Sequence, residues 1–84
     1  KKAAYINRAF ANERLGNAAA AIADYGVAIE LDPNDSLPYR NRGFLRESSG
    51  DLAGAASDYK RALELEPGNP AIARAVSTIG SRIR

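Results

Sequence analysis

The chain has 84 residues, a formal net charge of +2 at pH 7, and no cysteine, histidine or methionine. The lack of cysteine excludes disulfides, thiolate metal sites and cysteine nucleophiles, and the lack of histidine removes the commonest metal ligand and general base. Charged residues interrupt every apolar run before it reaches the length that spans a bilayer. We therefore expect no enzyme, no cofactor, no metal site and no membrane-spanning segment.

The absence of methionine also means that the chain does not begin at its own start codon. We expect a piece of a longer protein that lacks its own N-terminus. Its compartment is unknown, with the cytoplasm as the default.

The first half of the chain predicts two helices and the start of a third. Helix-favouring residues fill 3–15 and 19–31, and Gly16-Asn17 between them supplies the positive φ that a helix end favours. Proline then stops the incoming helix within Asp32-Pro33-Asn34-Asp35. Ser36 is the expected N-cap of the third helix.

The second half repeats this punctuation and adds a fifth helix. Gly50-Asp51 is the next break, with Asp51 as the expected cap of a helix that ends at Leu65. Asn69-Pro70 then opens a helix with one apolar stripe, formed by Ile72, Val76, Ile79 and Ile83. We expect this helix to cover the exposed end of the helix pair before it, because the last element of a stacked helical array needs a polar outer face. The alternative is the first helix of a truncated third repeat.

The sequence also matches itself when it is shifted so that Tyr5 is aligned with Tyr39. The same residue then recurs at the pairs Tyr5/Tyr39, Asn7/Asn41, Arg8/Arg42, Phe10/Phe44, Glu13/Glu47, Gly16/Gly50, Ala21/Ala55, Asp24/Asp58, Tyr25/Tyr59, Ala28/Ala62 and Pro33/Pro67. A fixed period of this size is typical of stacked helical repeats.

These recurring residues resemble the tetratricopeptide repeat (TPR) pattern, whose period is about 34 residues. The resemblance rests on the large aromatic, small, turn and closing positions, occupied by Tyr5/Tyr39, Ala9/Gly43, Gly16/Gly50, Ala21/Ala55, Tyr25/Tyr59, Ala28/Ala62 and Pro33/Pro67. It implies a single all-α domain over residues 1–84, a right-handed α-solenoid of five helices. Its parts are repeat 1 (2–35), repeat 2 (36–69) and a C-terminal capping helix (70–84). The Asn-Arg-Ala/Gly variant of the first helix resembles bacterial TPRs.

Basic residues outnumber acidic ones in the first helix of each predicted repeat and in the last helix. In TPR proteins the first helices line a concave groove, so the resemblance places positive charge there. We expect a protein-interaction scaffold that binds an extended or helical peptide with apolar side chains and at least one acidic group. The groove residues implied by the resemblance are Ile6, Asn7, Phe10, Glu13, Arg14, Leu37, Arg40, Asn41, Phe44, Glu47, Arg74 and Thr78.

Two arginines are expected to serve the fold instead. Arg8 and Arg42 precede the aspartates Asp24 and Asp58, respectively, by the same interval along the chain. We interpret them as repeated structural ion pairs that are costly to break from one side. The alternative is that these arginines hold a carboxylate of the ligand. Two roles remain open for Phe10 and Phe44. They either form an exposed apolar platform for the ligand, or they pack between adjacent repeats and only support the groove.

The carboxylate clamp of chaperone-binding TPRs is incomplete here. The clamp has a basic residue and an asparagine four apart on the first helix, where this chain has Ile6 and Phe10. Asn41 fits the asparagine of the second repeat, and Arg74 is a candidate cation. Two other functions remain as alternatives, namely self-association within a longer array and, with less support, RNA binding.

Overall fold

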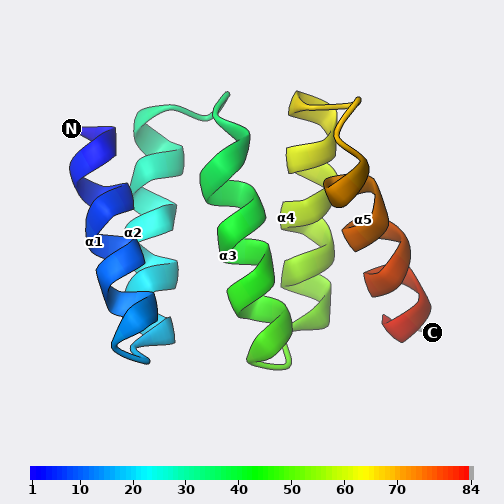
Figure 1. Cartoon of the computed structure of the whole chain (residues 1–84), viewed down its shortest axis with the longest axis horizontal. Helices are drawn as coiled ribbons and strands as arrows, with labels where there is room; N and C mark the ends of the chain where they lie inside the picture. The colour runs from blue at the N-terminus through cyan, green and yellow to red at the C-terminus, as the bar shows by residue number, and fades with distance from the viewer. Residues whose placement is uncertain (84) are drawn as a thin grey trace.

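The computed structural model describes residues 1–83, which form five α-helices and no strand (Figure 1). The helices are α1 (Lys2–Arg14), α2 (Ala18–Leu31), α3 (Ser36–Ser48), α4 (Leu52–Leu65) and α5 (Pro70–Ile83). Each helix packs against the next one in the chain. The result is a row of two helical hairpins and a closing helix, with N and C at opposite ends of the row.

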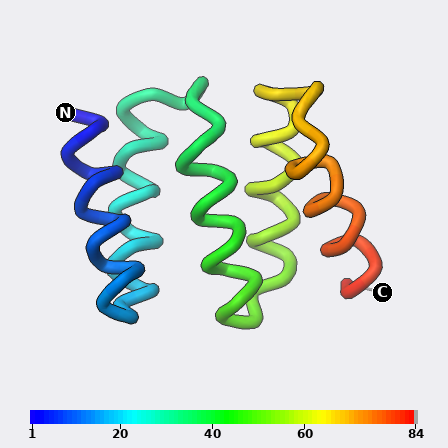
Figure 2. Tube along the Cα trace, viewed as in Figure 1, coloured from blue at the N-terminus to red at the C-terminus, as the bar shows by residue number. Residues whose placement is uncertain are grey.

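The tight turn inside each hairpin follows from a glycine (Figure 2). Gly16 has φ +80° and Gly50 has φ +91°, a region that side chains disfavour. In the first turn the Gly16 amide donates to the Glu13 carbonyl at 3.1 Å, and the Asn17 amide donates to the Asn12 carbonyl at 2.8 Å. These two bonds form a Schellman motif, which satisfies carbonyls that the helix end leaves free. The second turn repeats both bonds.

Asp35, and not Ser36, caps the third helix, so that sequence prediction was wrong. The Asp35 carboxylate accepts from the Leu37 amide at 3.1 Å. Ser36 is the first helical residue, and its hydroxyl donates to the Glu66 carboxylate. The two residues stand side by side and both suit a cap, so composition alone could not separate them. Asp51 is a cap as predicted, because its carboxylate accepts from the Gly54 amide at 2.9 Å.

The apolar core divides into two clusters, one for each hairpin. The first consists of Ala9, Ala21, Tyr25 and Leu45, and the second of Ala55, Tyr59 and Ile79. Leu45 belongs to α3 and Ile79 to α5. Each cluster is therefore completed by the helix that follows its hairpin, and α5 covers the second hairpin as predicted.

The four tyrosines that recur in the repeats separate into two pairs. Tyr25 and Tyr59 on the second helices are 0% and 3% exposed. Tyr5 and Tyr39 on the first helices are half-buried, and the guanidinium carbons of Arg8 and Arg61 lie 5.5 and 5.9 Å from their ring centroids. The second-helix tyrosines thus fill the cores, while the first-helix tyrosines form part of the surface.

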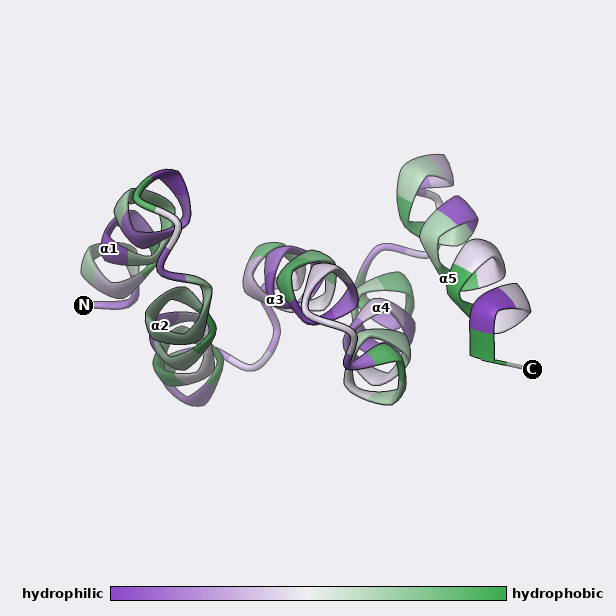
Figure 3. Ribbon diagram, turned by 90° about the horizontal axis from the view of Figure 1, so that it is seen from below, coloured by the Kyte–Doolittle hydropathy of each residue, from purple (hydrophilic) through white to green (hydrophobic). Residues whose placement is uncertain are grey.

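The helices lie on a shallow arc (Figure 3). Seen end-on, α1, α3 and α5 follow one side of the arc and α2 and α4 follow the other. The side formed by α1, α3 and α5 is the concave one. The basic first helices therefore face a common surface.

Candidate functional site

The twelve residues predicted to line a groove all belong to α1, α3 and α5. Their exposure is uneven. The exposed members are Asn7, Phe10, Arg14, Phe44, Arg74 and Thr78, and the half-buried members are Ile6, Glu13, Leu37, Arg40, Asn41 and Glu47. Their direct contact with a ligand stays a prediction.

Three of these residues are arginines without an acidic partner. Within residues 1–83, Arg14, Arg40 and Arg74 form no ion pair, whereas every other arginine of this part of the chain forms at least one. The three belong to α1, α3 and α5, one to each of these helices. Arg40 and Arg74 stand one repeat period apart, at equivalent places of α3 and α5. The arginines of residues 1–83 that form no ion pair therefore all lie on the helices of the concave side, whereas the unpaired Lys60 lies on α4.

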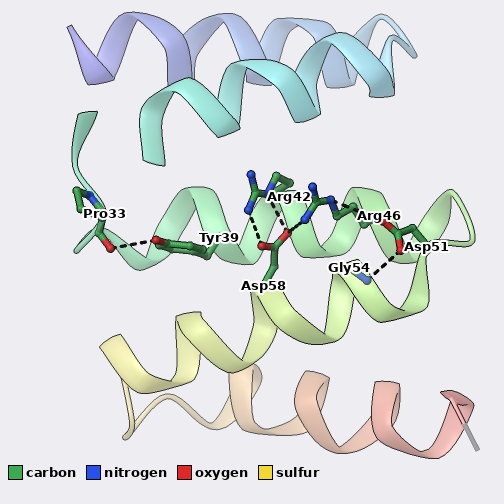
Figure 4. Close-up of polar contacts among 7 residues, drawn as sticks. All are labelled: Pro33, Tyr39, Arg42, Arg46, Asp51, Gly54 and Asp58. Atoms are coloured by element: carbon green, nitrogen blue, oxygen red, sulfur yellow. Dashed lines mark hydrogen bonds and ion pairs between the residues drawn. The ribbon is translucent and has the colours of Figure 1, made fainter. Parts of the chain in front are cut away.

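The Arg42–Asp58 pair joins the two helices of the second hairpin (Figure 4). Arg42 donates through Nε at 2.9 Å and Nη2 at 2.7 Å to the two carboxylate oxygens of Asp58. Arg46 adds a third bond at 3.1 Å. Asp58 is 2% exposed, so this buried carboxylate receives two cations and three hydrogen bonds.

Arg8 and Asp24 repeat this arrangement in the first hairpin, with bonds of 2.9 and 2.7 Å. Here the third donor is the Asn12 amide at 3.1 Å. Arg8 holds the pKa of the Asp24 carboxyl below its ordinary value, because the hydrogen bond and the positive charge stabilise the ionised form. Both arginines bind within their own hairpin, which favours a structural role over ligand binding.

Sequence reasoning missed the third donors, Asn12 and Arg46. A signal was available, since each stands four residues after the paired arginine, on the same face of its helix. A polar residue here completes the shell around a buried carboxylate.

Three predicted groove residues already bond to the buried tyrosines or to α5. The Tyr25 hydroxyl donates to Glu13 at 2.7 Å and accepts from the Asn41 amide at 3.3 Å. The Tyr59 hydroxyl donates to Glu47 at 2.8 Å, and Glu47 also accepts from Arg82 at 2.6 Å. Burial, followed by the bond to a carboxylate, raises the pKa of both phenols far above the ordinary value. Glu13, Asn41 and Glu47 therefore help to hold the hairpins together.

The two recurring phenylalanines differ in their surroundings. Phe10 is 38% exposed and packs edge-to-face on Tyr25, with ring centroids 6.2 Å apart. Phe44 is 60% exposed. Phe10 thus has a packing role inside the first repeat, while Phe44 offers most of its ring to solvent.

Other kinds of site receive no support from the described residues. Within residues 1–83 no group of three His, Cys, Asp or Glu side chains is placed to hold a metal ion. None of the helices in this range has the length and apolarity needed to cross a bilayer.

The sequence matches the profile of the Tetratricopeptide repeat family twice, over residues 2–35 and over residues 36–69. The chain belongs to the tetratricopeptide repeat family. This membership confirms the predicted family and the solenoid of two repeats with a capping helix. Proteins of this family are protein-interaction scaffolds and are not typically enzymes. No curated protein sequence matches the chain.

Three similar solved structures are TPR domains of RPAP3. The first TPR of Spaghetti (RPAP3) bound to the HSP90 peptide SRMEEVD has a TM-score of 0.91 and 32% identity over 99% of this chain. The first TPR domain of human RPAP3 has a TM-score of 0.85 and 34% identity over 94% of this chain. The second TPR domain of human RPAP3, in complex with the HSP70 peptide SGPTIEEVD, has a TM-score of 0.86 and 32% identity over 95% of this chain. The chain spans 66%, 62% and 67% of these three structures, respectively.

Proposed function

We propose that this protein binds a peptide segment of a partner protein on the concave face formed by α1, α3 and α5. The ligand is an extended or helical segment with apolar side chains and at least one acidic group. Family membership supports a peptide-binding interaction module, and two of the three similar structures hold a peptide. The finer description of the ligand rests on the side chains of this chain.

The single observation that carries the proposal is the placement of the unpaired arginines. Arg14, Arg40 and Arg74 each form no ion pair within residues 1–83, although the charge of Arg40 contributes to lowering the pKa of Glu66, and each belongs to a helix of the concave side. A guanidinium that has no internal partner can donate two parallel hydrogen bonds to a carboxylate. An acidic side chain of a ligand is the natural partner for such a group.

Phe44 supplies the apolar part of the proposed site. It follows Arg40 by four residues, so the two side chains share one face of α3. At 60% exposure the Phe44 ring has apolar area left to bury against a ligand. An apolar ligand residue next to an acidic one would satisfy both side chains together.

Recognition of a free C-terminal carboxylate is not part of the proposal. The positions of the clamp's first-helix cation and asparagine hold Ile6 and Phe10 here. Asn41, which fits the second asparagine of the clamp, already donates to the Tyr25 hydroxyl. We therefore expect an internal peptide segment in place of a chain end.

The test is a titration of the ¹⁵N-labelled protein with acidic-apolar and basic peptides, followed through the backbone amide spectrum. Acidic-apolar peptides should shift resonances of α1, α3 and α5, and basic peptides should not. Arg40→Glu should abolish the shifts. Lys60→Glu is the matched control, because it makes the same charge change at an exposed site on α4, away from the concave side. Equal losses in the two variants would show a non-specific charge effect and refute the proposal.

Two further arms separate the parts of the site. Phe44→Ala should weaken binding and leave the urea midpoint unchanged, whereas lost stability with intact affinity would refute the apolar contact. Peptides SRMEEVD and SGPTIEEVD, free or amidated at the C-terminus, should bind weakly and equally in both forms. Strong binding that amidation removes would refute recognition of an internal segment.

A further inference from the structure

The three helices of the concave side carry different chemistry at equivalent places. Two rows of equivalent residues cross these helices, four residues apart on each helix: Ile6, Arg40 and Arg74 in the first row, and Phe10, Phe44 and Thr78 in the second. On α1 both side chains are apolar, on α3 one is a cation and one an aromatic ring, and on α5 both are polar. Because α1, α3 and α5 follow one another along this side (Figure 3), the surface changes in one direction from apolar to cationic.

The side chains at the two ends of these rows have surface left for a ligand. Although Phe10 packs on Tyr25, it is 38% exposed, and Ile6 is half-buried. At the other end Arg74 and Thr78 are both exposed. An apolar ligand residue can therefore be buried at α1, and an acidic one can be bound at α5.

The two cations of the first row have no acidic partner to give up. Within residues 1–83 neither Arg40 nor Arg74 forms an ion pair. Glu66 accepts from the Asn69 amide at 2.9 Å and from the Ser36 hydroxyl, and these bonds, more than the charge of Arg40, lower its pKa. A ligand carboxylate can bind each of the two arginines without competing with an internal ion pair.

The distance between the two cations sets the spacing of the acidic groups in the ligand. Helices that pack together lie about 8 to 10 Å apart, and α3 and α5 both pack on α4. We therefore take the separation of equivalent places on α3 and α5 as on the order of 10 Å. An extended backbone covers this distance in about three residues.

Arg14 lies outside both rows. It follows Phe10 by four residues, so it stands one turn further along α1, in a third row with Ser48 and Arg82. In that row Arg82 already pairs with Glu47 at 2.6 Å. Arg14 thus provides a comparison for the first row, since it has the same charge and lies on a concave-side helix but outside the path across Arg40.

We propose that the ligand is an extended segment that crosses the helices in one orientation, with an apolar residue over Ile6 and Phe10 and two acidic residues, about three positions apart, over Arg40 and Arg74. This inference rests on the proposed peptide binding and adds the order and spacing of the ligand's groups. The reverse orientation would press a carboxylate against the apolar side chains of α1, where it would lose water without gaining a hydrogen bond. A segment that lies along a single helix would reach only one of the two arginines.

The probe is a peptide acetylated and amidated at its ends, with Leu-Phe near one end and two glutamates three positions apart near the other, joined by Gly-Ser. It is made in both chain directions, and the tighter binder is used. A nitroxide beside Leu-Phe should broaden the amides of α1 in the ¹⁵N-labelled protein, and a nitroxide beside the outer glutamate should broaden those of α5. Labels that broaden the opposite helices, or α1 and α5 equally, would overturn the inference but leave the proposed function intact. A probe that shifts no resonance of α1, α3 or α5 would overturn both.

A double-mutant cycle isolates the contact at α5. Arg74→Gln should weaken binding of the probe about fivefold, but should change binding of a probe with glutamine as the outer residue by less than about twofold. Arg14→Gln is the matched control, because it removes the same charge from an exposed arginine that forms no ion pair within residues 1–83. It should weaken both probes equally, by less than about twofold. Equal losses in the two variants, or an Arg74→Gln loss that is the same for both probes, would overturn the inference.

Discussion

Replacing the buried aspartates one at a time tests the roles of the two ion-pair clusters. Asp58→Asn keeps the shape of the side chain but removes the negative charge that faces Arg42 and Arg46. These two arginine side chains are 18% and 28% exposed, so water can replace the lost charge only in part. Breaking a buried pair from one side costs about 3 to 5 kcal/mol, and we take about 3 kcal/mol because the amide oxygen still accepts one bond.

Asp24→Asn makes the same chemical change in the first repeat. Its partner Arg8 is 65% exposed, and the third donor is a neutral amide. Water can solvate Arg8 after the substitution, so the loss in free energy of unfolding should be smaller by at least about 1 kcal/mol. A domain of 84 residues has roughly 4 to 12 kcal/mol in total at about 0.05 to 0.15 kcal/mol per residue, so the difference is measurable.

The assay is urea unfolding at 25 °C, followed by the far-UV circular dichroism of the helices, with both variants fitted to a shared slope. Glu30→Gln is the control, because it also removes one negative charge, at an exposed site on α2 that forms no ion pair within residues 1–83. It should shift the midpoint little. Equal losses in Asp24→Asn and Asp58→Asn, or a larger loss in Asp24→Asn, would refute the link between exposure of the arginine and the cost.

Three more predictions concern backbone crowding, pH and a buried phenol. A methyl group at Gly43 would lie 3.0 Å from the ring of Tyr59, whereas one at Gly80 would meet nothing within 4 Å. Gly43→Ala should therefore lower the melting temperature, and Gly80→Ala should raise the free energy of unfolding by up to about 1 kcal/mol. Arg8 lowers the folded pKa of Asp24, so this carboxylate stabilises the fold above its unfolded pKa of about 3.9 and loses that effect as pH falls through the folded pKa. Urea titrations from pH 5 to pH 2 should accordingly show a shallower decline in Asp24→Asn than in the parent. Tyr59→Phe should cost about 1 kcal/mol in urea unfolding and remove one late-ionising phenol from an alkaline absorbance titration.

The repeat itself was predictable because its signals are local in sequence. Gly16 and Gly50 end helices through their own backbone conformation, and Pro33 and Pro67 stop helices whatever their neighbours are. The repeat period then showed which helices are equivalent. Of the two predicted caps, only that of α3 was misplaced, by a single residue.

The polar network of the first helices was not predictable in the same way. Glu13 and Glu47 are predicted to line the groove, which stays a prediction, and the sequence did not indicate that each also accepts from a tyrosine hydroxyl on the second helix. Whether a hydroxyl reaches such a carboxylate depends on the distance between two packed helices, and residue spacing does not give that distance. Because each tyrosine aligns with a core position, its polar end was harder to place than its ring.

Equal residues at equivalent places also acquired different surroundings. Phe10 and Phe44 align in sequence, yet one packs on Tyr25 and the other is mostly exposed. The same holds for Arg8 and Arg42, because only the second of them lies beneath a preceding hairpin. A repeat alignment treats the copies as identical, whereas the position of each copy in the row decides what covers it.

The two junctions between successive units differ in their electrostatic character, and ionic strength should separate them. Between the packed helices, the first junction includes a bond between two neutral groups, from the Asn41 amide to the Tyr25 hydroxyl at 3.3 Å. Within residues 1–83 its one ion pair, Lys2–Asp35 at 3.0 Å, lies at the N-cap of α3. The second includes the Arg82–Glu47 ion pair at 2.6 Å, with side chains 49% and 22% exposed. Added salt screens an exposed pair of charges and leaves a neutral bond almost unaffected. Fraying at high salt should therefore begin at the last turn of α5, while the two hairpins stay joined.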